Sequence, residues 1–213
     1  MILKMKTHHD FDIRKEIDRK GLGMKYLEIS DNLEKNIGPI IYGQYKDNRD
    51  YGIHRTSKDQ IKDIEFGISK SFGLQLPQIL YCLNNDLKNK RILDLGCGSY
   101  PSTDGICTSW QPWLCRTLME LGSKPIGIDI GNLSFEEFEH YQLDLTKPGV
   151  LDFLPDNSID LANASQLVNS PYLNNPLRNF FRGGVYLLEI LKPQLERIVK
   201  PEGVLLYSDD KIN

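Results

Sequence analysis

Arg91-Ile92-Leu93-Asp94-Leu95-Gly96-Cys97-Gly98-Ser99 has the pattern of a short buried strand that runs into a glycine turn. Its apolar residues form a run of strand length, and two glycines mark its end. Glycine adopts a positive φ and lets a ligand approach the main chain, so this turn predicts the floor of a pocket. A lone Gly-x-Gly is equally compatible with an ordinary turn. Asp94 lies inside the apolar run, where a carboxylate needs hydrogen-bond partners because burying it unpaired is costly.

The bulk composition describes a globular, mildly acidic chain. It has 213 residues, a formal net charge of −3, 40% hydrophobic residues and 26% charged residues. This length supports one sizeable domain, and the charge gives no basic signature for nucleic acid. No apolar run approaches the roughly 18 residues needed to span a membrane, and residues 1–10 lack the apolar core of a signal peptide. We therefore expect a cytoplasmic protein without a membrane partner.

The cysteines and histidines indicate neither a metal site nor a disulfide framework. The four cysteines form no Cys-x-x-Cys pair. Cys97 lies in the glycine turn, where a small residue is needed. We interpret it as a space-filling residue and not as a nucleophile, since no histidine is near it in the sequence. The adjacent His8 and His9 are more typical of solvated side chains than of metal ligands.

Residues 1–55 are predicted to form an irregular, partly helical N-terminal segment. Residues 37–54 combine glycines and a proline with Tyr42, Tyr45 and Tyr51, which is typical of a loop. The tyrosines either pack on the domain, which is the interpretation we favour, or form a lid over a pocket.

Residues 56–213 are predicted to form an α/β domain with two leading helices. The first begins at Ser57, which has the capping-box spacing to Gln60, and the second covers 77–87. Further helices are predicted over 110–121, with Ser109 as cap, Pro112 in the first turn and Gly122 as terminator, and over 185–198, which Pro193 should kink or split. Further strands are predicted over 124–130, 140–145, 159–164 and, after a turn at 200–203, over 204–207.

The alternation of strands and helices predicts a mostly parallel sheet with right-handed crossovers. Polar residues lie at the ends of the first four predicted strands, at Asp94, Asp129, Asp144 and Asn163. Because the carboxyl ends of parallel strands meet at one edge, we expect these side chains to converge. An acid after the second strand can accept hydrogen bonds from a ribose diol, and one after the third from an exocyclic amine. The pattern therefore predicts a nucleoside-containing ligand.

Two departures argue against a dinucleotide. The fingerprint Gly-x-Gly-x-x-Gly has Pro101 at its third glycine position, and Asp129 follows Gly96 by 33 residues where about 20 are expected. A cofactor without phosphates fits better. S-adenosylmethionine has adenine, ribose, a sulfonium and an amino acid tail, and Asp94 is placed to serve the tail ammonium directly or through water.

Five motifs in order resemble the class I S-adenosylmethionine-dependent methyltransferases. They are Ile92–Gly98, Gly127–Asp129, Leu143–Leu145, Pro155–Leu161 and Val199–Leu205, and the match covers about 91–208. The resemblance implies a three-layer Rossmann-like fold with helices on both faces of the sheet. The residues expected to bind the cofactor are Asp94, Gly96, Cys97, Gly98, Asp129, Ile130, Asp144, Leu145, Asn163 and Ser165. Among these, the glycines would line the methionine tail, Asp129 the ribose, Asp144 the adenine amine, and Asn163 with Ser165 the floor near the transferred methyl.

The chain departs from that family in two places. The loop 99–105 is longer and more polar than the usual turn into the first helix. The family's last helix and antiparallel strand pair have no counterpart before Asn213. The sheet is then shortened, completed by residues 1–90, or completed by another chain, and an exposed edge would favour pairing with a second copy.

The leading prediction is a methyltransferase that acts on a small-molecule acceptor. The sulfonium is already a strong electrophile, so positioning suffices and a general base is needed only for oxygen or activated nitrogen nucleophiles. No Asn-Pro-Pro-Tyr or similar motif follows the fourth strand, so the acceptor atom, the catalytic residues and any metal ligand stay unassigned. The loop 169–184, with Arg178 and Arg182, is a candidate for substrate contact, although solvated arginines are slightly favoured. The alternatives are a non-catalytic cofactor-binding or regulatory protein of the same fold and, disfavoured by Pro101, a nicotinamide-dependent enzyme.

Overall fold

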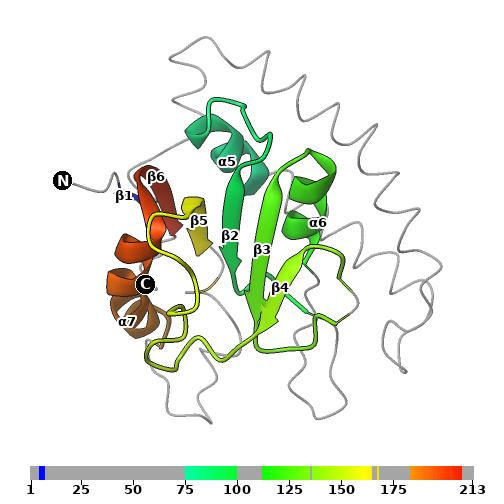
Figure 1. Ribbon diagram of the computed structural model, residues 1–213. Coiled ribbons are helices and arrows are strands. Elements are labelled where there is room, and N and C mark those ends of the chain that lie inside the picture. Colours follow the sequence, from blue (N-terminus) through cyan, green and yellow to red (C-terminus); the bar gives the residue numbers. More distant parts are fainter. Residues whose placement is uncertain are drawn as a thin grey trace, which may run out of the picture.

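A computed structural model describes residues 5–7, 75–99, 112–134, 136–164, 167 and 183–207. Within them, a six-stranded sheet has helices on both of its faces (Figure 1). The strand order is β1-β6-β5-β2-β3-β4, and every pair of neighbours is parallel. This confirms the predicted α/β, Rossmann-like class.

The strands are β1 (Met5–Thr7), β2 (Arg91–Leu95), β3 (Lys124–Asp129), β4 (Glu139–Gln142), β5 (Ile159–Ala164) and β6 (Val199–Tyr207). The helices are α5 (Leu76–Cys82), α6 (Trp113–Glu120) and α7 (Gly183–Ile198). β2, β3 and β5 occupy the predicted stretches to within one residue.

The two faces of β2 belong to different layers of the core. Leu93 and Leu95 pack in a cluster with Leu187, Leu191, Leu195 and Ile198 of α7. Ile92 packs on the opposite face with residues of α5 and α6, namely Leu76, Ile79, Trp113, Leu114 and Leu118. A central parallel strand covered on both faces has to be apolar nearly throughout, which explains why the run stands out in the sequence.

β1 forms the edge of the sheet beside β6. Met5 pairs with Leu205 and Thr7 with Tyr207. Residues from the 1–90 part of the chain therefore extend the sheet here, which is one of the three alternatives given above. The strand was missed because three residues are too few to show an alternating pattern. Pairing of the sheet edge with a second copy stays a prediction.

Both described helices before β3 are shorter than predicted. α5 ends at Cys82 and not near residue 87, because Asn84 and Asn85 adopt φ values of 52° and 60°. Asparagine enters this left-handed region more readily than most residues and so can end a helix.

α6 begins at Trp113 and not at residue 110. Pro112 occupies the N-cap position with a ψ of 53°, outside the helical range, and it offers no side-chain hydrogen bond there. The predicted cap, Ser109, lies outside the described residues. Gly122 follows the helix with a φ of 82°, as predicted.

Two boundaries after β3 also differ from the prediction. β4 ends at Gln142, because the side chain of Asp144 accepts the amide and the hydroxyl of Thr146 and turns the chain. Residues 200–203, predicted as a turn before the last strand, lie within β6 as a bulge. Ile159 pairs with Val199 and Leu161 with Val204, so four residues stand opposite the single residue 160.

Pro193 does not split α7, which is one helix of 16 residues. A proline removes one i→i−4 hydrogen bond from a helix interior. Here Leu187, Leu191, Leu195 and Ile198, on both sides of the proline, are all buried in the same cluster. Packing against the sheet therefore holds the two halves in one helix.

Several predictions fall outside the described residues. They concern the tyrosine-rich stretch 37–54, the helix after Ser57, the loop from Tyr100 onward, Ser165 and the stretch 169–182. The boundary between residues 55 and 56 stays a prediction.

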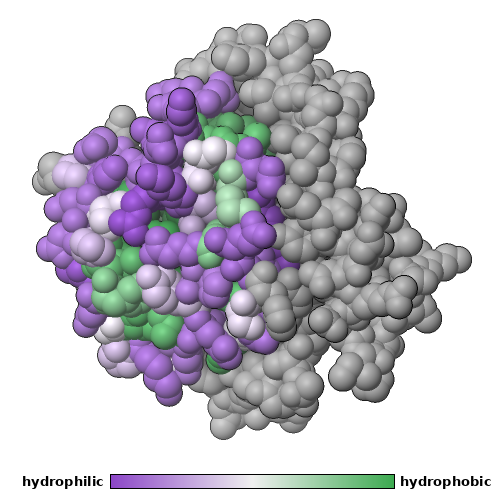
Figure 2. Space-filling model, turned by 45° about the vertical axis from the view of Figure 1, so that its right-hand side comes forward, coloured by the Kyte–Doolittle hydropathy of each residue, from purple (hydrophilic) through white to green (hydrophobic). Residues whose placement is uncertain are grey.

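Figure 2 shows that the described surface on this face is mostly hydrophilic, with smaller apolar areas between the polar ones. Among the helices that the structure describes, none is long and apolar enough to cross a membrane.

Candidate cofactor site

The turn after β2 is tied to the end of β3. Gly96 and Gly98 have φ values of 70° and 93°, where a side chain would strain the backbone. The amides of Gly96 and Cys97 both donate to the carbonyl oxygen of Ile128, at 2.8 and 3.2 Å. The predicted glycine turn is therefore a rigid element at the carboxyl edge of the sheet.

Asp129, the last residue of β3, joins that turn to the loop after β3. Its Oδ2 accepts the amide of Gly98 at 2.9 Å, and its Oδ1 accepts the amide of Gly131 at 3.0 Å. Burial raises the pKa of Asp129, while hydrogen bonds from Gly131, Gly98 and Ser99 oppose that rise. The carboxylate is thus fixed between two loops, with 5% of the residue exposed.

The same two loops also meet at Ser99 and Gly131, a contact that the sequence did not predict. A Cβ at Gly131 would lie 1.9 Å from the Oγ of Ser99, so only glycine fits there. A glycine two residues after an acid at a strand end is the signal that was available in the sequence. This contact sets how closely the loop after β3 approaches the glycine turn.

Asp94 and Asn163, predicted as separate cofactor contacts, bind each other. They are register partners on β2 and β5, and Asn163 Nδ2 donates to Asp94 Oδ1 at 2.8 Å. The thiol of Cys115 on α6 lies 3.7 Å from the other carboxylate oxygen. Burial raises the pKa of Asp94 to about 7, although the hydrogen bonds from Asn163 and Cys115 lower it. Both residues are at most 3% exposed, so their side chains form a buried polar layer under the turn.

Asp144 lies two residues past the end of β4 and is the most exposed of the three acids. One-third of its side chain is exposed, and Lys147 Nζ lies 3.6 Å from its Oδ2. Partial burial favours a higher pKa, but the hydrogen bonds from Thr146 and the charge of Lys147 bring the pKa of Asp144 below its usual value. Asp144 is therefore ionised at neutral pH. Its neighbour Leu145 is buried in the core, and Ile130 is half-buried.

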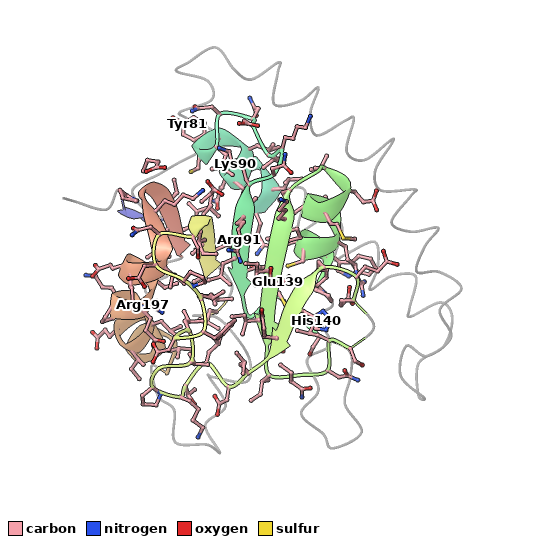
Figure 3. All side chains as sticks on the ribbon, in the orientation of Figure 1. Tyr81, Lys90, Arg91, Glu139, His140 and Arg197 are labelled. Carbon is pink, nitrogen blue, oxygen red and sulfur yellow. The ribbon has the colours of Figure 1, made fainter. Side chains whose placement is uncertain are left out.

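The opposite end of the strands carries a different chemistry. Arg91 and Glu139 are the first residues of β2 and β4, and Nη2 of Arg91 lies 3.6 Å from Oε1 of Glu139 (Figure 3). The carboxyl edge, in contrast, carries Asp129 and Asp144 at the ends of β3 and β4. No group of three or more His, Cys, Asp or Glu side chains suited to a metal ion occurs among the residues that the structure describes.

Cys97 fills space, as its place in the glycine turn predicts. Its sulfur packs beside Gly127, where an added Cβ would lie 2.9 Å from it, and in a buried cluster with Cys115, Leu133 and Phe138. Burial raises the pKa of the Cys97 thiol well above its usual value and the pKa of Cys115 to about 11. A direct contact of Cys97 with a cofactor stays a prediction.

These two thiols are expected to resist alkylation of the native protein at pH 8. Only the thiolate reacts, and both groups stay protonated and buried at this pH. Cys82, which is partly exposed, should be modified at least tenfold faster. Peptide mass spectrometry after timed iodoacetamide treatment measures the three rates, and equal rates for all three cysteines would contradict the expectation. A sample unfolded in urea gives the reference rates.

Comparisons with known proteins assign this chain to no family. No family model matches the chain, and neither does any curated protein. Among solved structures, the chain is similar to a crystal structure of the trans-methyltransferase CalH in complex with SAH, with 17% identity and a TM-score of 0.39. The alignment covers 88% of this chain and 53% of the other, so this chain spans about half the length of that protein. A likeness at this level carries no inference about activity.

Proposed function

We propose that this chain binds S-adenosylmethionine and transfers its methyl group to a small-molecule acceptor. The position of Asp129 is the observation that carries the proposal. Its carboxylate stands at the end of β3, fixed by Gly98 of the glycine turn and by Gly131. Each carboxylate oxygen can accept more than one hydrogen bond, so the group can also accept from a ribose diol placed over the turn.

The charge of the edge favours a cofactor without phosphates. Asp129 and Asp144 stand at the ends of neighbouring strands, and Asp144 is ionised. Carboxylates repel a pyrophosphate and attract the sulfonium and ammonium groups of S-adenosylmethionine. Pro101 in place of the third fingerprint glycine agrees with this choice.

The proposed roles follow the strand order. Gly96 and Gly98 admit the methionine tail against the main chain, Asp129 binds the ribose, and Asp144, which follows the next strand, accepts from the adenine amine. Asp94 lies below the turn and stabilises the ammonium group of the methionine tail indirectly, through the loop or through a water molecule. Ser165 and the acceptor-side residues belong to the proposal on sequence grounds only.

In this proposal, the protein contributes position and desolvation to the chemical step. The acceptor's lone pair attacks the methyl carbon, the carbon–sulfur bond breaks, and its electrons stay on sulfur to leave S-adenosylhomocysteine. A nucleophile that carries a proton loses it to water or to a base, which we leave unassigned. The geometry of attack requires the sulfonium to be held still, which the fixed turn and Asp129 favour.

A non-catalytic binding protein of the same fold is the second candidate, and one observation favours it. Asn163, assigned above to the floor near the transferred methyl, is 1% exposed and donates its amide to Asp94. A side chain committed in this way has little to offer an acceptor.

Titration calorimetry with S-adenosylhomocysteine and with NAD tests the binding part of the proposal. We expect micromolar or tighter binding of S-adenosylhomocysteine and no heat with NAD, and the reverse pattern would refute the proposal. Incubation with methyl-labelled cofactor and a fractionated metabolite extract then separates the two candidates. Label transferred to a small molecule supports the enzyme, and binding without transfer supports the second candidate.

A further inference from the structure

A buried ion pair joins α6 to the loop after β3. Arg116 Nε donates to Glu136 Oε2 at 3.0 Å, and Arg116 Nη2 lies 2.5 Å from Glu136 Oε1. The two side chains are 1% and 0% exposed. The guanidinium also lies over the ring of Trp113, 4.5 Å from its centre.

Stability alone is a poor explanation for such a pair. Removing two charges from water is costly, and a pair of well-packed apolar side chains is often as stable or more so. A two-point contact between a guanidinium and a carboxylate adds a fixed distance and a fixed orientation, which apolar side chains lack. Arg116 and Glu136 therefore hold the loop in one position relative to α6.

The loop in question is the one that builds the proposed ribose site. It starts directly after Asp129, and its Gly131 donates to that carboxylate and contacts Ser99. Leu133 and Phe138 of the same stretch pack on Cys97 in the glycine turn. A shift of the loop would move Gly131 away from Asp129 and from the turn.

We infer that Arg116 and Glu136 are positioning residues for the cofactor site, an inference that rests on the proposed function. Both side chains are almost fully buried and pair with each other. They act through the loop, by keeping Gly131 against Asp129 and Ser99.

The double variant Arg116→Met/Glu136→Leu tests the inference, because it leaves no unpaired buried charge. We expect its melting temperature to stay within a few degrees of the parent's, its dissociation constant for S-adenosylhomocysteine to rise at least tenfold, and the amide of Gly131 to exchange at least tenfold faster in the ligand-free protein. The matched control is Arg91→Met/Glu139→Leu, which removes a half-exposed Arg–Glu pair at the other end of the strands. The control should change neither the dissociation constant for S-adenosylhomocysteine nor the exchange rate of the Gly131 amide.

A folded double variant with parental affinity and parental exchange at Gly131 would overturn the inference. If the parent protein itself binds no S-adenosylhomocysteine, the proposed function fails, and the exchange rate of Gly131 still decides whether the pair positions the loop. If the double variant does not fold, Arg116→Lys takes its place. It keeps the charge but loses the two-point contact, and we expect at least threefold faster exchange at Gly131, with parental exchange as the overturning result.

Discussion

Asp129→Ala is expected to weaken the binding of S-adenosylhomocysteine at least about 100-fold. Two hydrogen bonds from a ribose diol to a carboxylate contribute about 3 kcal/mol together, which corresponds to a factor of about 100. The substitution also removes the acceptor that the amides of Gly98 and Gly131 share. Both loops lose the group that holds them together, so the affinity falls further.

Titration calorimetry at constant pH and salt measures the effect. Asp86→Ala is the matched control, since Asp86 lies between α5 and β2 and its side chain is 64% exposed. Within the part of the chain that the structure describes, its one ion pair is a 3.7 Å contact with Lys90. The control should bind as the parent does. Asp129→Asn keeps the shape of the side chain and loses its charge. Its affinity for S-adenosylhomocysteine should fall between the affinities of Asp129→Ala and of the control. Parental affinity in Asp129→Ala would show that the ribose assignment is wrong.

Asp94→Asn is expected to stabilise the ligand-free protein at pH 8, by up to about 4 kcal/mol. The pKa of Asp94 rises from its ordinary 3.8 to about 7 in the folded chain, chiefly through burial. Stability that is present below pH 4 is therefore lost as the pH rises toward 7, because the unfolded chain releases the proton first. A difference of about three pKa units at about 1.4 kcal/mol each gives the quoted cost. Asparagine does not ionise, and its amide oxygen can still accept from Asn163.

Urea unfolding at pH 5 and pH 8 tests this expectation. The gain from Asp94→Asn should be larger at pH 8 by about 2.6 kcal/mol, because between these pH values the folded chain still holds a proton on Asp94 that the unfolded chain has already released. Asp160→Asn is a control of opposite sign. Partial burial favours a higher pKa for Asp160, but the hydrogen bonds from Lys200 and Arg91 bring it below its usual value. That variant should lose stability equally at both pH values, and an equal gain at both for Asp94→Asn would show that Asp94 does not titrate in this range.

The same Asp94→Asn protein should bind S-adenosylhomocysteine more weakly than the parent if Asp94 serves the methionine tail. A buried acid that lowers stability near neutral pH is typical of functional sites, where charge is kept at a cost to the fold. Higher stability with unchanged affinity would leave Asp94 as part of the buried layer only.

The sequence predicted those elements that have a strong local signal. β2, β3 and β5 are central strands covered on both faces, so their apolar runs are continuous and easy to find. β1 was missed because it is three residues long, and the end of α5 was misplaced because two asparagines, and not a glycine or proline, take the left-handed conformation. The extent of β4 was overestimated because a side-chain hydrogen bond at Asp144 ends it, and hydrophobicity does not report such a bond.

The α/β class, the glycine turn and the acids at the strand ends could be predicted from the residues alone, because they depend on residue type and spacing along one segment. Which of these groups meet depends on how the segments pack in three dimensions. Asn163 and Asp94 are 69 residues apart, Asp129 and Gly98 are 31 apart, and Glu136 and Arg116 are 20 apart. Their contacts follow from the order of the strands and from the packing of α6 on the sheet. Asp94 thus became a buried partner of Asn163, whereas Asp129 became the carboxylate that joins the two loops of the candidate site.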